Sequence, residues 1–183
     1  MNASLLSDRL WPQTGLARNV VLAVVGSLVV AAAAQVNVPM IPVPMTLQTL
    51  AVLMIGAAYG SRLGAATLAL YALEGAIGLP VFAEFKSGVM LASFGYVLGF
   101  IAAAWVVGYL AERGWDRSVP KMFAAMLLGA AVLYVPGLIW LSGFIGVEKA
   151  IQYGLMPFLA GDLVKAAVAA LGFPAAWALL GRR

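Results

Sequence analysis

Six apolar stretches alternate with short connections along most of the chain, a pattern that predicts a bundle of membrane-spanning helices. Most of these stretches have the roughly 17–25 residues that a transmembrane helix needs. The second is shorter, about 13 residues or roughly 20 Å at 1.5 Å of rise per residue, so we expect it to begin partly within the bilayer. The six predicted spans are residues 19–36, 47–59, 63–78, 89–110, 122–140 and 158–180.

Prolines and glycines separate these spans. Three prolines between residues 39 and 44 cannot continue a helix and force the residues before them toward extended conformations, which predicts a stiff loop. Thr46 follows this loop as the expected N-cap of the second span. Residues 60–62 predict a tight connection. Residues 79–88 predict a loop that either covers a cavity as a lid or lies at the membrane interface.

The composition is typical of a membrane protein. Of 183 residues, 64% are hydrophobic and only 10% are charged, against an apolar share of about 45–50% in soluble domains. The chain contains no cysteine and no histidine, which removes disulfides, thiol nucleophiles, the usual zinc and haem sites, and a serine–histidine triad. It also lacks a phosphate-binding loop. We therefore expect no enzyme, no metal and no cofactor. We divide the chain into a tail at residues 1–18 and one all-α transmembrane domain at residues 19–183.

The basic residues are distributed unevenly between the two sides that six spans define. Eight lie on the side of the termini and two, Lys86 and Lys149, lie on the other side. Membrane loops rich in Lys and Arg stay in the cytoplasm, so we expect cytoplasmic termini and a location in the bacterial cytoplasmic membrane. The net charge is +4, and the basic residues are scattered over loops. The preference of Lys and Arg for cytoplasmic loops explains this distribution better than binding to nucleic acid does. The eight residues are Arg9, Arg18, Arg62, Arg113, Arg117, Lys121, Arg182 and Arg183.

Asp162 and Lys165 are the only charged residues in the last span. Ionisable side chains cost about 2.5–3.5 kcal/mol each inside hydrocarbon, so they are usually paired and functional. Their i,i+3 spacing places both on one face of a helix, about 7 and 12 Å along its axis from Pro157. Such a pair suits a polar ligand with donors and acceptors. The alternative is a structural pair that joins two helices.

Further polar residues lie near the same outer end of the predicted bundle. Gln48 is in the first turn of the second span, where it meets a ligand or hydrogen-bonds a neighbouring loop. Glu74 lies about 6 Å from the outer end of the third span, where it faces the site or extends to water. Because Gln48 and Glu74 converge in depth with Asp162 and Lys165, we interpret the four together as an outward-facing binding site.

Small residues recur at i,i+4 spacing in the first span, at Ala23, Ser27 and Ala31. Such a stripe lets another helix approach closely, so we predict that it docks a partner protein. The alternative is packing inside the bundle, because alanine is common in membrane spans.

Four segments carry a family resemblance. They are residues 42–49 (Pro-Val-Pro-Met-Thr-Leu-Gln-Thr), 75–83 (Gly-Ala-Ile-Gly-Leu-Pro-Val-Phe-Ala), 95–100 (Gly-Tyr-Val-Leu-Gly-Phe) and 161–165 (Gly-Asp-Leu-Val-Lys). Together and in this order they resemble the BioY family, the biotin-specific substrate-binding (S) components of energy-coupling factor (ECF) transporters. The resemblance implies a six-helix membrane fold with an outward-facing vitamin site. It also implies a transmembrane coupling protein and ATPase subunits as partners, bound through small residues of the first span. Homo-oligomerisation stays open.

By this resemblance, Asp162 and Lys165 match the biotin-contacting aspartate and lysine of the family. The acceptor-only Asp162 suits the two N–H groups of the ureido ring, and the donor-only Lys165 suits its carbonyl. Lys165 or Lys86 is expected to meet the carboxylate of the ligand, and Tyr96 to form part of the apolar wall. The chain departs from the family at residues 84–96, where a Gly-Pro-Thr-Gly-Gly-Tyr stretch is absent. The lid conformation and the carboxylate contact therefore do not follow from the resemblance.

Other functions are alternatives at this point. An S component for another vitamin would differ only in its ligand. A proton-coupled carrier that acts alone would use Glu74 and Asp162 and would respond to a pH gradient. A structural membrane protein would not need Asp162 and Lys165.

Overall fold

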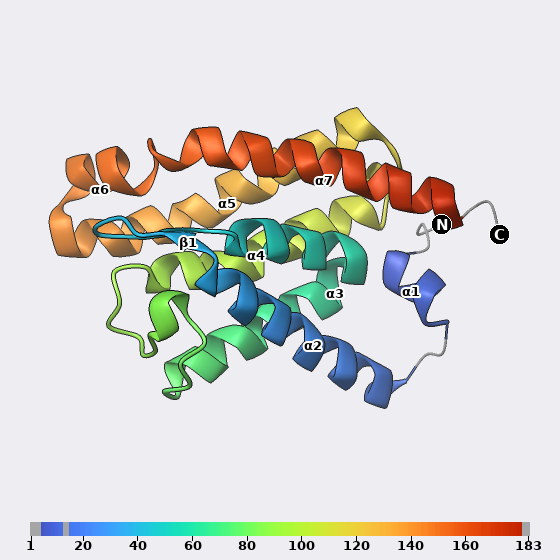
Figure 1. Cartoon of the computed structure of the whole chain (residues 1–183), viewed down its shortest axis with the longest axis horizontal. Coiled ribbons are helices and arrows are strands. Elements are labelled where there is room, and N and C mark those ends of the chain that lie inside the picture. Colours follow the sequence, from blue (N-terminus) through green and yellow to red (C-terminus); the bar gives the residue numbers. More distant parts are fainter. Residues whose placement is uncertain (1–4, 13–14, 181–183) are drawn as a thin grey trace.

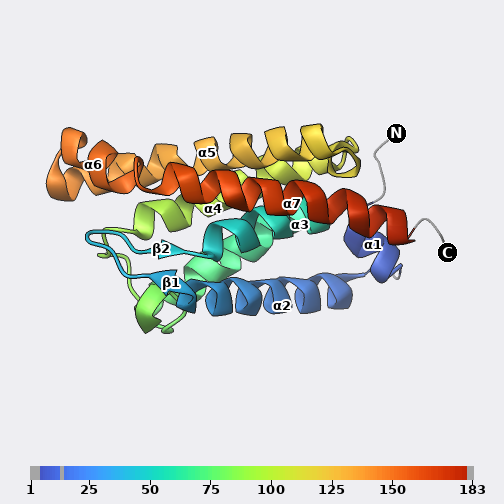
Figure 2. The same cartoon turned by 45° about the horizontal axis from the view of Figure 1, so that its top comes forward.

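The computed structural model describes residues 5–12 and 15–180, which form a helical bundle (Figures 1 and 2). Among these residues, five helices are long and apolar enough to cross a membrane, namely α2, α3, α4, α5 and α7. The helices are α1 (Leu6–Leu10), α2 (Leu16–Gln35), α3 (Gln48–Ala76), α4 (Phe94–Ala111), α5 (Val119–Ile145), α6 (Val147–Gly154) and α7 (Phe158–Leu180). The other described elements are the strands β1 (Asn37–Val38) and β2 (Met45–Thr46) and the 3₁₀ turns η1 (Ala83–Phe85) and η2 (Trp115–Arg117).

The second and third predicted spans together correspond to α3, which ends two residues earlier than expected and reverses its direction at Gly60. Gly60 has φ 83° and ψ 178°, a conformation that glycine adopts readily because it has no Cβ. A Cβ added to Gly64 would lie only 3.0 Å from the Cα of Gly56, although these residues would be about 12 Å apart along a straight helix. Figure 1 shows the two halves running in opposite directions. Glu112 Oε1 accepts hydrogen bonds from the N–H and the hydroxyl of Ser61, both at 2.8 Å, and so fixes the reversal against the end of α4.

Several predicted boundaries differ from those of the structure. The first span begins at Leu16, so the predicted tail at residues 1–18 includes α1 and the first residues of α2. The fourth span begins at Phe94, five residues later than expected, because the apolar residues 89–93 form turns rather than helix. The short amphipathic helix α6 occupies a region that we expected to be loop.

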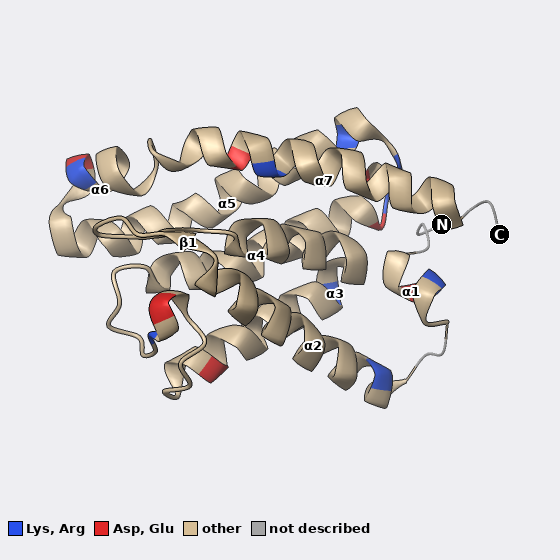
Figure 3. Cartoon of the chain, in the orientation of Figure 1, with Lys and Arg blue, Asp and Glu red and all other residues tan. Residues whose placement is uncertain are grey.

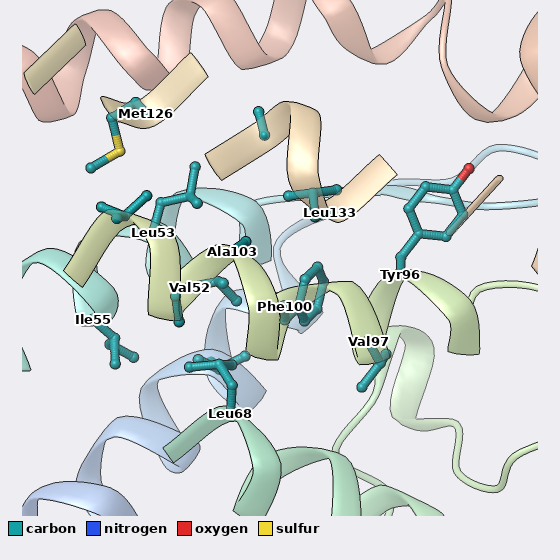
Figure 4. Close-up of a cluster of buried hydrophobic side chains, with 14 of the residues drawn as sticks. Val52, Leu53, Ile55, Leu68, Tyr96, Val97, Phe100, Ala103, Met126 and Leu133 are labelled. Carbon is teal, nitrogen blue, oxygen red and sulfur yellow. The ribbon is translucent and has the colours of Figure 1, made fainter. Parts of the chain in front are cut away.

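The core of the bundle lies where α4 packs between α3 and α5 (Figure 4). Val52 and Leu53 of α3, Phe100 and Ala103 of α4, and Leu133 of α5 are buried there. Lipid chains are as apolar as these side chains, so close packing stabilises such a core more than removal from water does.

The loop at residues 36–47 folds into a two-stranded antiparallel hairpin, in which Asn37 pairs with Thr46. The helix α3 begins at Gln48, one residue later than a Thr46 N-cap predicts. The Thr46 hydroxyl nevertheless accepts a hydrogen bond from the Gln48 N–H at 3.2 Å, so the predicted capping contact is present. The hairpin lies at the end of the bundle opposite α1 (Figure 2).

The loop at residues 77–93 covers the same end and is attached to α2 and α3. Gln35 Nε2 donates to the Phe82 carbonyl at 3.0 Å, and Gln35 Oε1 accepts from the Phe85 N–H at 3.2 Å. The Tyr71 hydroxyl donates to the Val81 carbonyl at 2.9 Å. The ring of Phe82 lies on Gly75, where an added Cβ would come within 2.0 Å of it. The two loops therefore close one end of the bundle.

Charged residues gather mostly at the two ends of the bundle, and one pair lies inside α7 (Figure 3). The connections that carry Arg62, Arg113 and Arg117 lie at the same end as α1 (Figure 1). Arg182 and Arg183 lie outside the described residues. The uneven charge distribution read from the sequence is thus a difference between the two ends of the molecule.

Candidate functional site

A cavity of about 50 Å³ lies beneath the two loops. Its walls are mostly aromatic and aliphatic, and a few polar side chains point into it from α3, α5 and α7. This combination is typical of a small-molecule site. The lining residues are Val43, Pro44, Thr46, Gln48, Thr49, Phe82, Ala83, Ser93, Tyr96, Val97, Phe100, Leu133, Tyr134, Phe158 and Lys165.

Asp162 and Lys165 form the ion pair that their spacing suggests. Lys165 Nζ lies 3.3 Å from Asp162 Oδ1, and the side chains of Lys165 and Asp162 are 14% and 8% exposed. The cost of desolvating two charges exceeds what their mutual attraction returns unless further hydrogen bonds satisfy them. The pair therefore depends on its neighbours.

Thr49 and Tyr134 provide these additional hydrogen bonds. Lys165 Nζ donates to Thr49 Oγ1 at 2.7 Å, and the Thr49 hydroxyl lies 3.4 Å from Asp162 Oδ1, to which it donates. The Tyr134 hydroxyl donates to Asp162 Oδ2. Side chains from α3, α5 and α7 thus converge on one carboxylate, and we call these four residues the polar cluster.

The members of the polar cluster face two different spaces. Thr49, Tyr134 and Lys165 line the cavity, whereas Asp162 and Tyr134 line a groove between α5 and α7. Because Tyr134 gives its hydrogen to Asp162, the lone pairs of its oxygen are free to accept a hydrogen bond from the cavity side. Asp162 therefore makes the cavity wall richer in acceptors, while Lys165 supplies donors.

The sequence pattern does not single out Thr49 or Tyr134. Their hydrogen bonds to Asp162 connect residues 113 and 28 positions apart in the chain, and spacing within one helix cannot reveal such contacts. One chemical signal was present, since the hydroxyl of a buried tyrosine normally has a hydrogen-bond partner.

Gln48 connects the cavity to the covering loop. Its side chain lines the cavity, and its Nε2 donates to the Tyr71 hydroxyl at 2.6 Å. Tyr71 in turn donates to the Val81 carbonyl of the loop at 2.9 Å. Both alternatives considered for Gln48, contact with a loop and a position facing a ligand, are therefore compatible with its place.

Tyr96 lines the cavity, and its hydroxyl is already hydrogen-bonded. The hydroxyl donates to the Gly154 carbonyl at the end of α6, at 2.8 Å. The ring meets that of Tyr134 edge-on, with centroids 6.1 Å apart. Tyr96 thus forms part of an aromatic wall, as expected for a residue beside an apolar ligand.

Glu74 and Lys86 do not join the polar cluster. The Glu74 carboxylate accepts a hydrogen bond from the Ser27 hydroxyl, between α2 and α3. Lys86 is 56% exposed and forms an ion pair with Glu84 in the covering loop. The lining of the cavity includes neither residue. Glu74 therefore does not converge with Asp162 and Lys165 as its depth suggested, and Lys86 lies in the loop above the cavity.

The predicted docking stripe on α2 faces the bundle. Ser27 is 0% exposed, and Ala31 packs against the core. Ala23 is half-buried. This placement favours the alternative of internal packing.

The sequence model of the BioY family matches residues 2–182 of this chain. The chain belongs to the BioY family. The "Biotin transporter BioY" of Thermotoga maritima is 36% identical over 158 residues, which cover 84% of this chain and 92% of the relative. The "Probable biotin transporter BioY" of Pyrococcus horikoshii is 37% identical over 141 residues, 75% of this chain and 83% of the relative. A crystal structure of the S-component for biotin from an ECF-type ABC transporter has a similar fold. The TM-score is 0.73 over 87% of this chain and 90% of that chain, at 21% sequence identity.

The four segments that resemble the BioY family all reach the cavity. Residues 42–49 form the end of the hairpin and the start of α3, and residues 75–83 lead from α3 to Phe82. Residues 95–100 form the first turns of α4, and residues 161–165 carry the charged pair of α7. Each segment contributes at least one residue to the cavity lining, so the sequence features typical of the BioY family surround one space.

Proposed function

We propose that this BioY-family chain captures biotin as the substrate-binding component of an ECF-type transporter and takes part in biotin uptake. The observation that carries the proposal is the meeting of all four family-like segments around a cavity with a polar cluster. The relatives named as biotin transporters support the ligand. A transporter component of this kind is not an enzyme.

The ureido ring of biotin has two N–H donors and one carbonyl acceptor, and the polar cluster offers the matching groups. Lys165 has only donors and suits the carbonyl. The oxygens of Asp162 and the hydroxyl oxygen of Tyr134 suit the N–H groups. The aromatic wall that includes Tyr96 suits the apolar bicycle. Lys86 is the candidate for the carboxylate, because it belongs to the loop that covers the cavity.

Binding requires the covering loops to move. Pockets for small ligands have volumes of about 300–1,000 Å³, whereas this cavity measures about 50 Å³. Phe82 and the hairpin residues Val43 and Pro44 occupy the space on the loop side. Their displacement would open the cavity toward the end of the bundle that the loops close. The chain Gln48–Tyr71–Val81 would transmit a contact at the cavity wall to the loop.

The direct test is whether the purified protein holds biotin. We expect protein reconstituted in nanodiscs without its partners to bind radiolabelled biotin saturably, with unlabelled biotin as competitor. Absence of biotin binding together with saturable binding of radiolabelled thiamine or riboflavin would identify an S component for another vitamin. If the chain takes up biotin without partners, at a rate that depends on a pH gradient, the result would favour a proton-coupled carrier.

The proposed topology has six crossings and cytoplasmic termini, in the bacterial cytoplasmic membrane. The reversal of α3 at Gly60 and the eight-to-two division of basic residues support it. Reporter fusions after Trp115 should therefore be active in the cytoplasm, and fusions after Lys149 should be active outside. The opposite pattern would place the cavity on the cytoplasmic side and contradict a role in capture from the exterior.

The coupling protein and ATPase subunits of an ECF transporter are the proposed partners. The stripe of small residues at Ala23, Ser27 and Ala31 is one proposed docking surface, and it requires access to those side chains. The burial of Ser27 weighs against it.

A further inference from the structure

A second space adjoins the polar cluster on the side that faces lipid. This groove, of about 470 Å³, lies between α5 and α7 and is lined mainly by leucine and alanine side chains. Leu159 and Leu163 on one wall are 44% and 51% exposed. The groove is therefore open toward the hydrocarbon of the membrane.

Two members of the polar cluster form the boundary between groove and cavity. Tyr134 lines both spaces, and Asp162 lines the groove while its ion-pair partner Lys165 lines the cavity. The hydrogen bond from the Tyr134 hydroxyl to Asp162 joins α5 to α7 at this boundary. A ligand head that binds Asp162 in place of this hydrogen bond would lie between the two spaces, so the rest of the molecule could extend into either.

The two directions suit different chemistry. Beyond the polar cluster, the cavity offers the side chains of Thr46, Gln48 and Ser93 to a charged or polar end. The groove offers aliphatic walls and, at its base, an anionic carboxylate. A second anion in that setting would be repelled in a medium of low dielectric constant, whereas a neutral alkyl chain would be accepted.

We propose that the groove between α5 and α7 is a lateral extension of the ligand site and receives the chain of neutral, alkyl-bearing biotin derivatives such as N-alkyl amides. The proposal rests on the proposed function, because the ureido head is held by the same polar cluster. Free biotin, whose chain ends in a carboxylate, extends toward the cavity. The derivative with an uncharged chain extends into the groove.

The test compares biotin N-methyl amide with biotin N-octyl amide as competitors of radiolabelled biotin, on protein in nanodiscs. Both amides lack the carboxylate, so the ratio of their affinities reports only the effect of the alkyl chain. In the parent protein the octyl amide should bind at least about tenfold more tightly than the methyl amide, since even one methylene in an apolar pocket gives such discrimination. Ala131→Trp fills the groove from α5 and should bring the ratio to within about twofold, well under a tenfold change. Leu163→Trp narrows the groove from α7 and should act in the same direction.

Leu128→Trp is the matched control, since Leu128 lies on α5, is 48% exposed and lies outside the groove lining. It should preserve the preference for the octyl amide. Ordinary partitioning of the octyl amide into the bilayer would give the same preference to every variant, so a loss confined to the groove variants reports binding in the groove. Biotin binding by each variant reports that it is folded. If biotin binds and the parent shows no octyl preference, or if the groove variants retain it, the groove is not part of the site and the biotin function stands. If no protein binds biotin, the proposed function fails and this extension fails with it.

Discussion

We expect Asp162→Asn to lower the affinity for biotin by at least about tenfold and to reduce the yield of folded protein. Asp162 accepts hydrogen bonds from Thr49, Tyr134 and Lys165. The amide keeps the shape but replaces one acceptor oxygen by a donor group. It loses charge-assisted hydrogen bonds worth about 1.5–3 kcal/mol each, and a tenfold change in affinity corresponds to about 1.4 kcal/mol. Titration calorimetry on monodisperse protein measures the binding, and fluorescence-detected gel filtration measures the yield.

Lys165→Met is expected to have an effect of similar size by a different route. It keeps the aliphatic stem and removes the donor to Thr49 and Asp162. Removing one member of a buried pair typically costs about 3–5 kcal/mol, because it leaves the other charge without compensation. The double variant Asp162→Asn with Lys165→Met should therefore restore the yield of folded protein, because no unpaired charge is left, but it should not restore the affinity for biotin to the same extent.

Thr49→Val removes the hydroxyl that bridges Lys165 and Asp162. It leaves the direct 3.3 Å contact between Lys165 and Asp162 in place, so it should weaken biotin binding less than either charge variant does. If both charge variants bind biotin within about twofold of the parent, the pair has a structural role only and the site lies elsewhere.

The sequence was informative where the determining contacts are local. The i,i+3 spacing of Asp162 and Lys165 fixes their common face through helix geometry alone, and the ion pair forms as expected. The tight connection at residues 60–62 followed from the conformational freedom of glycine, and Gly60 does reverse the chain.

Contacts between helices could not be predicted in the same way. Thr49 and Tyr134 join the polar cluster only because α3 and α5 pack beside α7. Glu74 lies near the end of α3 as expected, but its carboxylate meets Ser27 of α2 instead of the cavity. Depth in a membrane follows from residue number, whereas the direction in which a side chain points depends on how the helices pack.

Ser27→Leu should prevent the protein from folding, and not only from assembling with a partner. Ser27 is fully buried between α2 and α3, and its hydroxyl donates to Glu74. Forcing extra methylenes into a packed interface costs about 1–3 kcal/mol. Loss of the hydroxyl leaves a part-buried carboxylate without this donor, which costs a further ~1–3 kcal/mol. The expected result is loss of monodisperse protein and of biotin binding together, measured by gel filtration and by radioligand binding.

Ala32→Leu is the matched control, because Ala32 is an exposed small residue on the same helix. It makes a small residue large on the lipid-facing side and should leave both folding and biotin binding unchanged. Ser27→Ala removes only the hydroxyl, so it should destabilise the protein less than Ser27→Leu does. The docking interpretation predicts a different result, in which Ser27→Leu folds and binds biotin normally but no longer copurifies with the coupling protein. That outcome would require α2 to expose Ser27 in the assembled transporter, against its position beside Glu74 in this structure.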